Sequence, residues 1–356
     1  PYPEVLARMH EVMMDGWGNP SSPHVVGRRA KEMLEDSRAI IADVLGVDAE
    51  EIYFTSGSTE SNNLAIRGAC LAQRENPGKI VTSTLEHSSV TRTVRGMRRD
   101  FDWDCRYVDA PDGCFDMEQL AEQLQDGPTS LISVMRVQNE TGWIFPISEI
   151  AQLRDELAPG VQLLTAGAHK IGGPRGIGIL YVRRGLPMHT TAFGGNQERG
   201  LRSGTEPVFL AVGMAEAVRI TAAHMETDME YAASLRERAI EGLKREIPDV
   251  VVHALEGGSP YILSISVPGL PNAVSVKYLS GRRVCVSRAS ACEESHTTVA
   301  PGTWRPKHPL ALQAAGIPLR EGKETLRASF FHRNTPEDVD RFVAVLAQCA
   351  REMRES

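Results

Sequence analysis

Hydrophobic and polar positions along the first part of the chain fall into two alternating patterns. Short, mostly apolar runs, which are typical of buried strands, alternate with longer segments whose apolar residues recur at helical spacing. The expected strands are 51–55, 79–83, 105–108, 131–137, 161–165 and 177–182. The expected helices are 22–45, 63–75, 88–99, 117–124 and 147–157. This strand–helix rhythm predicts an α/β fold with a mainly parallel sheet that helices cover on both faces.

The pattern changes at about residue 226. A long helix at 229–245 precedes antiparallel-looking strands, and a closing helix spans 336–351. These strands are expected at 250–253, 261–267, 284–287 and 325–329. We therefore expect a large α/β domain at 16–225 and a smaller α+β domain that combines 1–15 with 226–356.

Composition narrows the class of protein. The 356 residues are 42% hydrophobic and 24% charged, which is ordinary for a globular protein with a large core. The net charge of −7 argues against direct nucleic-acid binding, and no apolar run reaches the roughly 18 residues of a membrane span. The six cysteines form no C-x-x-C pair, so we expect free thiols in a reducing cytoplasm and no metal site. The start, Pro1-Tyr2-Pro3-Glu4, is not a signal peptide, and the absent initiator methionine indicates a chain that is trimmed or incomplete at that end.

Polar clusters follow four of the expected strands, at 56–63, 86–87, 138–139 and 168–170. The carboxyl ends of parallel strands meet at one edge of a sheet, and ligands bind at that edge in such folds. We therefore expect the four clusters to converge on one site.

Lys170 ends one of these strands and precedes a glycine-rich turn at 172–178. A lysine held there can be partly desolvated, and burial lowers the pKa of an amine. A neutral amine attacks carbonyl groups, so Lys170 is a candidate for a Schiff base. Taken alone, the motif is more typical of a solvated lysine in a hairpin. The other motifs of the chain favour the Schiff-base interpretation.

Two further clusters have both a structural and a functional interpretation. The segment Ser56-Gly57-Ser58-Thr59-Glu60-Ser61 lies between a strand and a helix, where hydroxyl and backbone N–H groups favour a phosphate. Helix capping explains one of its hydroxyls but not all four. His87 follows another strand, where a structural role is the more common one. It could instead stack on a flat heterocycle or transfer a proton.

The second half of the chain adds a thiol and an arginine. Cys292 lies among small and polar residues, which predicts an exposed thiol on a loop, and Arg288 would favour its thiolate. Cys285, between two valines, fits a buried structural cysteine better. Arg327 is a charge inside a strand-like run, and its planar fork suits a substrate carboxylate. The glycine-rich loop 194–207 is either a plain surface loop or one that reaches a phosphate in a neighbouring subunit.

Together these segments resemble cysteine desulfurases of the class V aminotransferase type, which are pyridoxal-phosphate enzymes of fold type I. The resemblance runs from about Pro3 to Arg351. The segments that carry it are Gly18 to His24, Thr55 to Asn63, Leu85 to His87, Asn139 to Gly142, Ala168 to Gly178, Gln197 to Thr205, and Ser290 to Cys292.

The resemblance implies a role for each matching residue. Lys170 would hold pyridoxal 5'-phosphate as a Schiff base and then move protons, and His87 would stack on the pyridine ring. Ser58, Thr59 and His169 would bind the phosphate. Thr205 would reach the phosphate of the other subunit of a homodimer. Asn139 would lie near the ring hydroxyl and the substrate, and Arg327 would bind the carboxylate of L-cysteine. Cys292 would take the sulfur as a persulfide and release L-alanine. A protein sulfur acceptor would follow.

The chain departs from this family just before Lys170. The family has another strand there, carrying Asp-Ala-x-Gln, whose aspartate pairs with the pyridinium nitrogen and whose glutamine pairs with the ring hydroxyl. Here Gly160-Val161-Gln162 runs directly into the lysine strand, and about 25 residues are absent, the usual length of a strand plus its crossover. The family's phosphate-binding serine is replaced by Gly167, and Asp155, in a helix, is no substitute for the aspartate. Either the protein is a cofactor-poor relative, or the natural protein has a segment that this sequence lacks.

Two other functions stay open. One is a catalytically impaired or cofactor-free homologue that acts as a sulfur-transfer scaffold, and the other is a different class V lyase or aminotransferase. Replacement of Cys292 by serine would separate a desulfurase from an aminotransferase. The sequence does not identify the sulfur acceptor, and iron–sulfur cluster assembly, thiolation and DNA phosphorothioation are all compatible with it.

Overall fold

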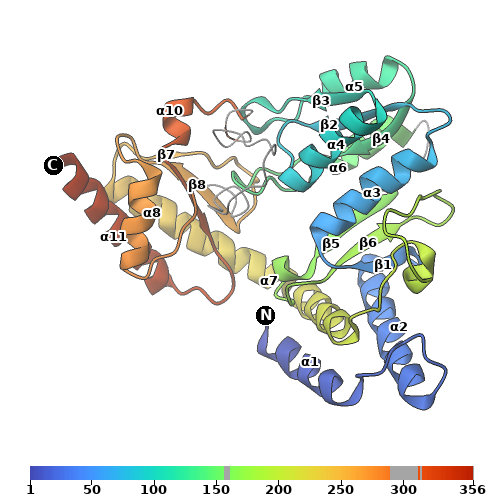
Figure 1. Cartoon of the computed structure of the whole chain (residues 1–356). Helices are drawn as coiled ribbons and strands as arrows, with labels where there is room; N and C mark the ends of the chain where they lie inside the picture. The colour runs from blue at the N-terminus through green and yellow to red at the C-terminus, as the bar shows by residue number, and fades with distance from the viewer. Residues whose placement is uncertain (156–160, 289–311, 313–314, 356) are drawn as a thin grey trace.

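The computed structural model describes residues 1–155, 161–288, 312 and 315–355. The first two-thirds of the chain form helices around two small sheets, and the last third forms a third sheet with its own helices (Figure 1). The long helix α7 (Val208–Glu246) runs from one part to the other (Figure 1).

The first sheet has the order β1–β6–β5 and is antiparallel. Its strands are β1 (Ile52–Thr55), β5 (Leu163–Gly167) and β6 (Gly178–Val182). In the middle strand, Ile179 and Tyr181 pack with α2 (Val25–Leu45) and α7, whereas Leu180 and Val182 pack with α3 (Ser58–Ala72). This alternation buries both faces of the sheet.

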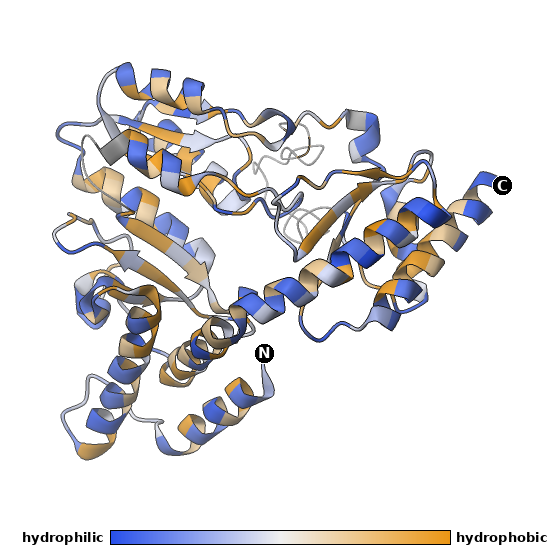
Figure 2. Cartoon of the chain, turned by 180° about the vertical axis from the view of Figure 1, so that it is seen from behind, coloured by the Kyte–Doolittle hydropathy of each residue, from blue (hydrophilic) through white to orange (hydrophobic). Residues whose placement is uncertain are grey.

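The second sheet has the order β3–β2–β4 and is parallel. Its strands are β2 (Lys79–Ser83), β3 (Cys105–Val108) and β4 (Thr129–Ser133). Ile80 packs with α3 and α4 (Ser88–Phe101) on one face. Val81 packs on the other face with α5 (Met117–Gln125) and α6 (Ile147–Asp155). Figure 2 shows hydrophobic stretches in these strands, and helices with one hydrophobic and one hydrophilic side.

Helix α3 connects the two sheets. Leu64 and Ala65 belong to the core of the first sheet, and Ile66 and Cys70 belong to the core of the second. The helix packs against β4 and β5, each of which ends its own sheet. The middle strands β2 and β6 are buried throughout, whereas no residue of β4 is fully buried and Leu164 of β5 is 38% exposed. In the described residues no strand pairs with the free edge of β4 or of β5.

The third sheet has the order β7–β8–β9 and is antiparallel. Its strands are β7 (Val251–Val252), β8 (Ile262–Ser266) and β9 (Thr325–Ser329). Leu263 and Ile265 alternate with Ser264 and Ser266 along β8. The apolar side packs against the second half of α7, α8 (Asn272–Gly281) and α11 (Pro336–Glu355), and the short helix α10 (Leu319–Gly322) precedes β9. The other side of the sheet is therefore polar.

Judged by length and composition alone, helix α7 could cross a membrane, since the mean hydropathy of its most apolar window is 1.3. Its buried residues have protein partners along the helix, however. Ala211 and Met214 pack on the first sheet, and Ala239 and Leu243 pack on the third. Because the apolar stripe is covered in this way, α7 is better explained as a long core helix.

The α/β fold expected from the sequence is confirmed. The expected bounds of β2, β3 and β9 match the structure. The parallel arrangement holds only for the second sheet, because β6 runs against both of its neighbours. Helix α1 (Pro3–Asp15) and helix α8 were not expected, and α7 begins before the predicted helix, after Pro207.

The strand expected at 284–287 is wrong. Only Ser287 bridges to Arg327 there. Val284 and Val286 still pack on the third core, and Cys285 points the opposite way and is exposed. The prediction of a buried Cys285 is therefore wrong, because alternate residues of an extended segment face opposite sides.

Candidate functional site

The amino end of α3 lies beside the strand that leads to Lys170. Gly57, at φ 145°, is the N-cap, and Ser58 is the first helical residue. A Cβ at Gly167 would lie 2.3 Å from Ser58 Oγ, so a larger residue there would require the Ser58 hydroxyl to move. A Cβ at Gly57 would meet nothing within 4 Å, so the loop borders open space. Backbone N–H groups, hydroxyls and the helix dipole together make this a place for an anion.

Lys170 and His169 follow β5 in the short helix η3 (Ala168–Lys170). Burial, Lys170 and Arg175 lower the pKa of His169. The expected desolvation of Lys170 is wrong for the single chain, because its side chain is exposed. The free edge of β5 accounts for this, since no described strand covers that side.

His87 caps the amino end of α4. Its Nδ1 accepts a hydrogen bond from the backbone N–H of Ser89 at 3.1 Å and lies 2.8 Å from Ser89 Oγ. Burial and the positive charge of Lys170 lower the pKa of His87. The neighbouring charge shows that His87 and Lys170, which lie far apart in the sequence, meet at one site.

Asn62 on α3 joins the two sides of this site. Its Oδ1 accepts a hydrogen bond from Thr165 Oγ1 on β5 at 2.6 Å, and its Nδ2 donates to Ser89 Oγ at 2.8 Å. Sequence reasoning missed both Asn62 and Ser89. The pair Ser88-Ser89 after His87 is a helix-capping signal that could have indicated the bond to Ser89.

Glu86 is a buried carboxyl group next to His87. Its Oε1 accepts hydrogen bonds from Ser83 Oγ at 2.9 Å and from the backbone N–H of Met135 at 2.7 Å. It thus ties the end of β2 to the segment after β4. Burial raises the pKa of Glu86 to about 7.

Arg327 extends from the polar side of the third sheet toward the large part of the molecule. Its Nη1 donates a hydrogen bond to the backbone oxygen of Asn139 at 2.7 Å. Its Nε is buried and has no hydrogen-bond partner within the described part of the chain. A buried guanidinium N–H without a partner indicates a place for an acceptor from outside the chain, such as a carboxylate.

The remaining predicted site residues make few described contacts with Lys170, His87 or Arg327. Thr59 lies in the first turn of α3, and its backbone oxygen accepts a bond from Asn63. Thr205 is exposed on the loop before α7. The neighbouring Arg202 is ion-paired with Glu60 of α3 at 3.0 Å. Cys292 lies outside the described residues.

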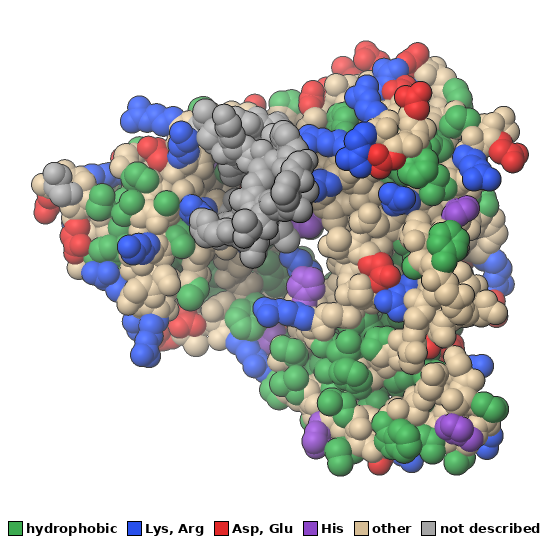
Figure 3. All heavy atoms as spheres, viewed as in Figure 1, with side chains coloured by type: hydrophobic (Ala, Val, Ile, Leu, Met, Phe, Trp, Pro, Cys, Tyr) green, Lys and Arg blue, Asp and Glu red, His purple; other side chains and the backbone are tan. Residues whose placement is uncertain are grey.

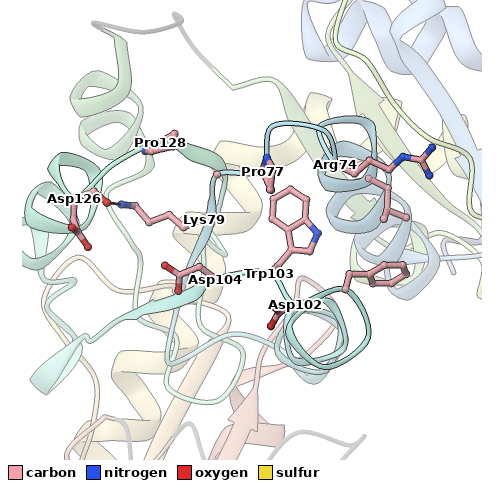
Figure 4. Close-up of a pocket in the computed structure, with 11 residues that line it drawn as sticks. Arg74, Pro77, Lys79, Asp102, Trp103, Asp104, Asp126 and Pro128 are labelled. Atoms are coloured by element: carbon pink, nitrogen blue, oxygen red, sulfur yellow. Dashed lines mark hydrogen bonds between the residues drawn. The ribbon is translucent and has the colours of Figure 1, made fainter.

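Figure 3 shows histidine and Lys or Arg side chains around the hollow between the two parts of the molecule. A different cavity, of about 430 Å³, lies at the opposite ends of the strands in the second sheet (Figure 4). It is lined by Lys79, Asp104 and Pro128, which lie at or just before the starts of β2, β3 and β4. Lys79 donates an ammonium hydrogen bond to the backbone oxygen of Asp126, and Arg74 is a second cation in the lining of this cavity.

Comparison with known proteins places the chain among relatives of one family. The family model for class V aminotransferases matches residues 2–159 and 155–342. A NifS/IcsS protein homolog of Lactobacillus delbrueckii is 35% identical, with 96% of this chain and 92% of that protein aligned. The cysteine desulfurase IscS of Escherichia coli is 34% identical, with 99% and 91% aligned.

The chain belongs to the class V aminotransferase family. A solved NifS-like protein has the same fold, with a TM-score of 0.88 at 28% identity over 97% of this chain and 95% of that one. The resemblance to cysteine desulfurases is thereby confirmed. Class V enzymes of this type depend on pyridoxal phosphate.

The comparisons also locate what this class V chain lacks. The alignment with the Lactobacillus protein spans 367 residues but covers 96% of the 356 residues here, so that relative has roughly 25 residues without a counterpart. The family model matches in two pieces that meet at 155–159, between α6 and β5. The free edges of β4 and β5 flank the same point in the chain.

The described residues fit part of the family's cofactor. The end of α3 suits its phosphate, and Lys170 and His87 suit its aldehyde and ring. The edge strands β4 (Thr129–Ser133) and β5 (Leu163–Gly167) carry no acidic residue that could pair with the ring nitrogen. The described residues therefore suit the phosphate and the aldehyde of the cofactor, but β4 and β5 provide no partner for its ring nitrogen.

Proposed function

We propose that this protein is a cysteine desulfurase that binds pyridoxal 5'-phosphate, takes sulfur from L-cysteine and passes it to a protein acceptor. The observation that carries the proposal is that the charge of Lys170 acts on His87 near the amino end of α3, together with a buried Arg327 N–H that has no partner among the described residues. An amine, an aromatic ring, an anion site and a carboxylate site are the four contacts that a pyridoxal enzyme acting on an amino acid needs.

Each end of the cofactor and substrate has a residue to hold it. Ser58, Thr59 and His169 would bind the phosphate with the backbone of α3. His87 would lie against the ring, and Asn139 would lie between the ring hydroxyl and the substrate. Pyridoxal phosphate, when bound, supplies a carbonyl for amines and a ring that withdraws electrons from the substrate.

The substrate and the protons are handled by other groups. Arg327 would orient L-cysteine by its carboxylate, using the buried Nε–H that has no partner in the described part of the chain. Lys170 Nζ would accept and return a proton on the substrate, because it is the amine of this set and is exposed at the end of β5. Cys292 would attack the substrate sulfur and carry it as a persulfide, which leaves L-alanine as the product.

A homodimer completes the proposal. Thr205 is exposed in the single chain, where it would reach the phosphate of a second subunit. Several large apolar side chains in and after α1 are exposed, and a contiguous apolar surface is typical of a subunit interface. They are Leu6, Met13, Met14, Trp17 and Val25. We place the enzyme in the cytoplasm.

The test is production of alanine from L-cysteine by the purified protein with added pyridoxal phosphate, and of sulfide when dithiothreitol is present to reduce the persulfide. Wild type should form alanine and show the visible absorbance of a lysine-bound pyridoxal. Lys170→Ala should lose both. Cys292→Ser should keep the absorbance and lose sulfur transfer, whereas an aminotransferase would keep its activity. Absence of the band at saturating cofactor would reject the proposal.

A sulfur-transfer scaffold without catalysis is the second candidate. The free edges of β4 and β5 favour it, because they leave the cofactor ring without an acidic partner. The scaffold would need neither Lys170 nor Arg327. Retained binding of a sulfur acceptor by a protein that forms no alanine would support this candidate.

A further inference from the structure

A continuous row of side-chain hydrogen bonds links the strand of Lys170 to His87. Thr165 Oγ1 on β5 donates to Asn62 Oδ1 at 2.6 Å. Asn62 Nδ2 donates to Ser89 Oγ at 2.8 Å, and Ser89 Oγ lies 2.8 Å from His87 Nδ1. The row crosses from the first sheet to the second through α3.

The direction of the row follows from its donors. The Asn62 amide occupies one lone pair of Ser89 Oγ, so the Ser89 hydroxyl proton is available to His87 Nδ1. The backbone N–H of Ser89 also points at Nδ1, at 3.1 Å. Two donors at one ring nitrogen leave no room for a proton on it.

We propose that Ser89 and Asn62 are positioning residues that keep His87 Nδ1 unprotonated, so that the neutral ring carries its proton on Nε2. His87 then meets the cofactor and substrate as a hydrogen-bond donor rather than as a base. The proposal rests on the proposed function only for the role of His87, since the tautomer itself exists with or without catalysis.

Two observations agree with a neutral ring. His87 lies partly buried, and the charge of Lys170 acts against a second proton. The same amide also sets the distance between the half of the site that carries Lys170 and the half that carries His87. Within the described residues no strand pairs with β5 on its free side. The hydrogen bonds of Asn62 to Thr165 and Ser89 therefore connect the two halves of the site directly.

The neighbouring residue gives a matched control. Asn63 Nδ2 donates to the backbone oxygen of Thr59, one turn back on the same helix, at 2.9 Å. A charge introduced at position 63 therefore lies on α3 but outside the row. Asn62→Asp and Asn63→Asp make the same chemical change on adjacent residues.

The experiment measures ¹⁵N resonances of labelled histidine in the protein without cofactor, with His87→Gln to assign the signal. Wild-type His87 should show an unprotonated Nδ1 and a protonated Nε2. In Asn62→Asp the carboxylate attracts the Ser89 hydroxyl proton and favours the cationic ring, so a larger share of Nδ1 should be protonated at the same pH. Asn63→Asp should leave the His87 signals unchanged.

Activity provides the second readout. Asn62→Asp and Ser89→Ala should each lower kcat for alanine formation by roughly 5- to 30-fold, the span of a lost hydrogen bond or two, and Ser89→Thr should restore most of it because it keeps the hydroxyl.

A wild-type His87 with a protonated Nδ1, or identical His87 signals in wild type and Asn62→Asp, would overturn the inference. If Asn62→Asp does not fold, the wild-type spectrum and Ser89→Ala decide. An inactive protein with the expected His87 tautomer would support the inference and contradict the proposed function.

Discussion

The position of Arg327 follows from the way in which alternate side chains of a strand face opposite sides of the sheet. Leu326 and Ala328 face the core of the third sheet, so Arg327 must face the polar side. There it contacts the backbone of Asn139, and its buried Nε–H has no partner among the residues that the structure describes. The sequence predicted this residue because a charge inside an apolar strand needs an acceptor.

Arg327→Lys keeps the charge and removes the planar fork. We expect the KM for L-cysteine to rise by roughly 10- to 100-fold, with little change in the midpoint of thermal unfolding, because a point charge replaces a bidentate donor. Steady-state kinetics measure this. Arg320→Lys, at a side chain that is 89% exposed, is the control. An unchanged KM would show that Arg327 does not contact the substrate.

Glu86 makes stability depend on pH. Its folded pKa of about 7 lies above the value of 4.5 that holds in the unfolded chain. Between these pH values the folded state keeps a proton that the unfolded state has lost, so the free energy of unfolding falls as pH rises. The total loss is roughly 3 kcal/mol, most of it below pH 7 and complete by about pH 8.

Glu86→Gln removes this titration and keeps the acceptor for Ser83 and Met135. We expect the stability of the variant relative to wild type to increase from pH 5 to pH 8. Urea unfolding at the two pH values measures the difference. A constant difference would mean that Glu86 titrates below this range.

The sequence predicted those site residues whose role follows from the residue type and its place after a strand. It did not predict the residues whose role depends on a contact between distant parts of the chain. Lys170 and His87 follow strands and so were expected at one edge. The desolvation of Lys170 was expected wrongly, because a sequence does not show that β5 has a free edge. Asn62 and Ser89 were missed because their hydrogen bonds join residues from separate elements.

At the scale of elements, apolar runs predicted strands better than helix ends. Strands β2 and β3 have the expected bounds, because both are short, apolar and flanked by polar residues. Helix α3 starts at Ser58 rather than at Asn63, since the serine and threonine of the presumed loop form its first turn. The division of the chain within α7 into two domains stays a prediction.

A buried ion pair fixes β1 against the loop that carries Thr205. Arg38 of α2 binds both oxygens of Glu198 at 2.8 Å, and the two side chains are 3% and 0% exposed. The backbone N–H of Phe54 also donates to Glu198. The pair thus joins α2, β1 and the turn η4 (Gln197–Gly200).

Glu198→Gln should lower the free energy of unfolding by about 3–5 kcal/mol, because it removes the buried counter-charge of Arg38 and leaves only the half-exposed Glu35 to pair with it. Urea denaturation measures the change. Glu35 binds the same arginine, but its side chain is 47% exposed. Glu35→Gln should therefore cost under about 1 kcal/mol. Equal effects of the two substitutions would contradict this account of the pair.

At the scale of the whole molecule, the two small sheets form one incomplete layer. Helix α3 packs on both, and β4 and β5 are half-exposed where the middle strands are buried. Relatives have roughly 25 further residues, and the break in the family match falls between α6 and β5. A strand with its crossover has about this length.

Insertion of the corresponding segment of the Lactobacillus relative between Asp155 and Val161 should raise the free energy of unfolding by on the order of 2–5 kcal/mol, because it would cover apolar residues of β4 and β5. It should also strengthen the absorbance of bound pyridoxal phosphate. A Gly/Ser insertion of equal length is the control. A chimera no more stable than this control would show that the edges of β4 and β5 do not accept a strand.

The packing of α1 has a consequence for synthesis on the ribosome. Val5 and Val12 of α1 are buried, and Val12 packs against Val208 and Val212 of α7, some 200 residues later in the chain. At about 5–20 residues per second, the apolar face of α1 stays without its partner for roughly 10–40 seconds after it leaves the ribosome. During that interval a chaperone that binds exposed apolar helices would meet α1 before its own chain does.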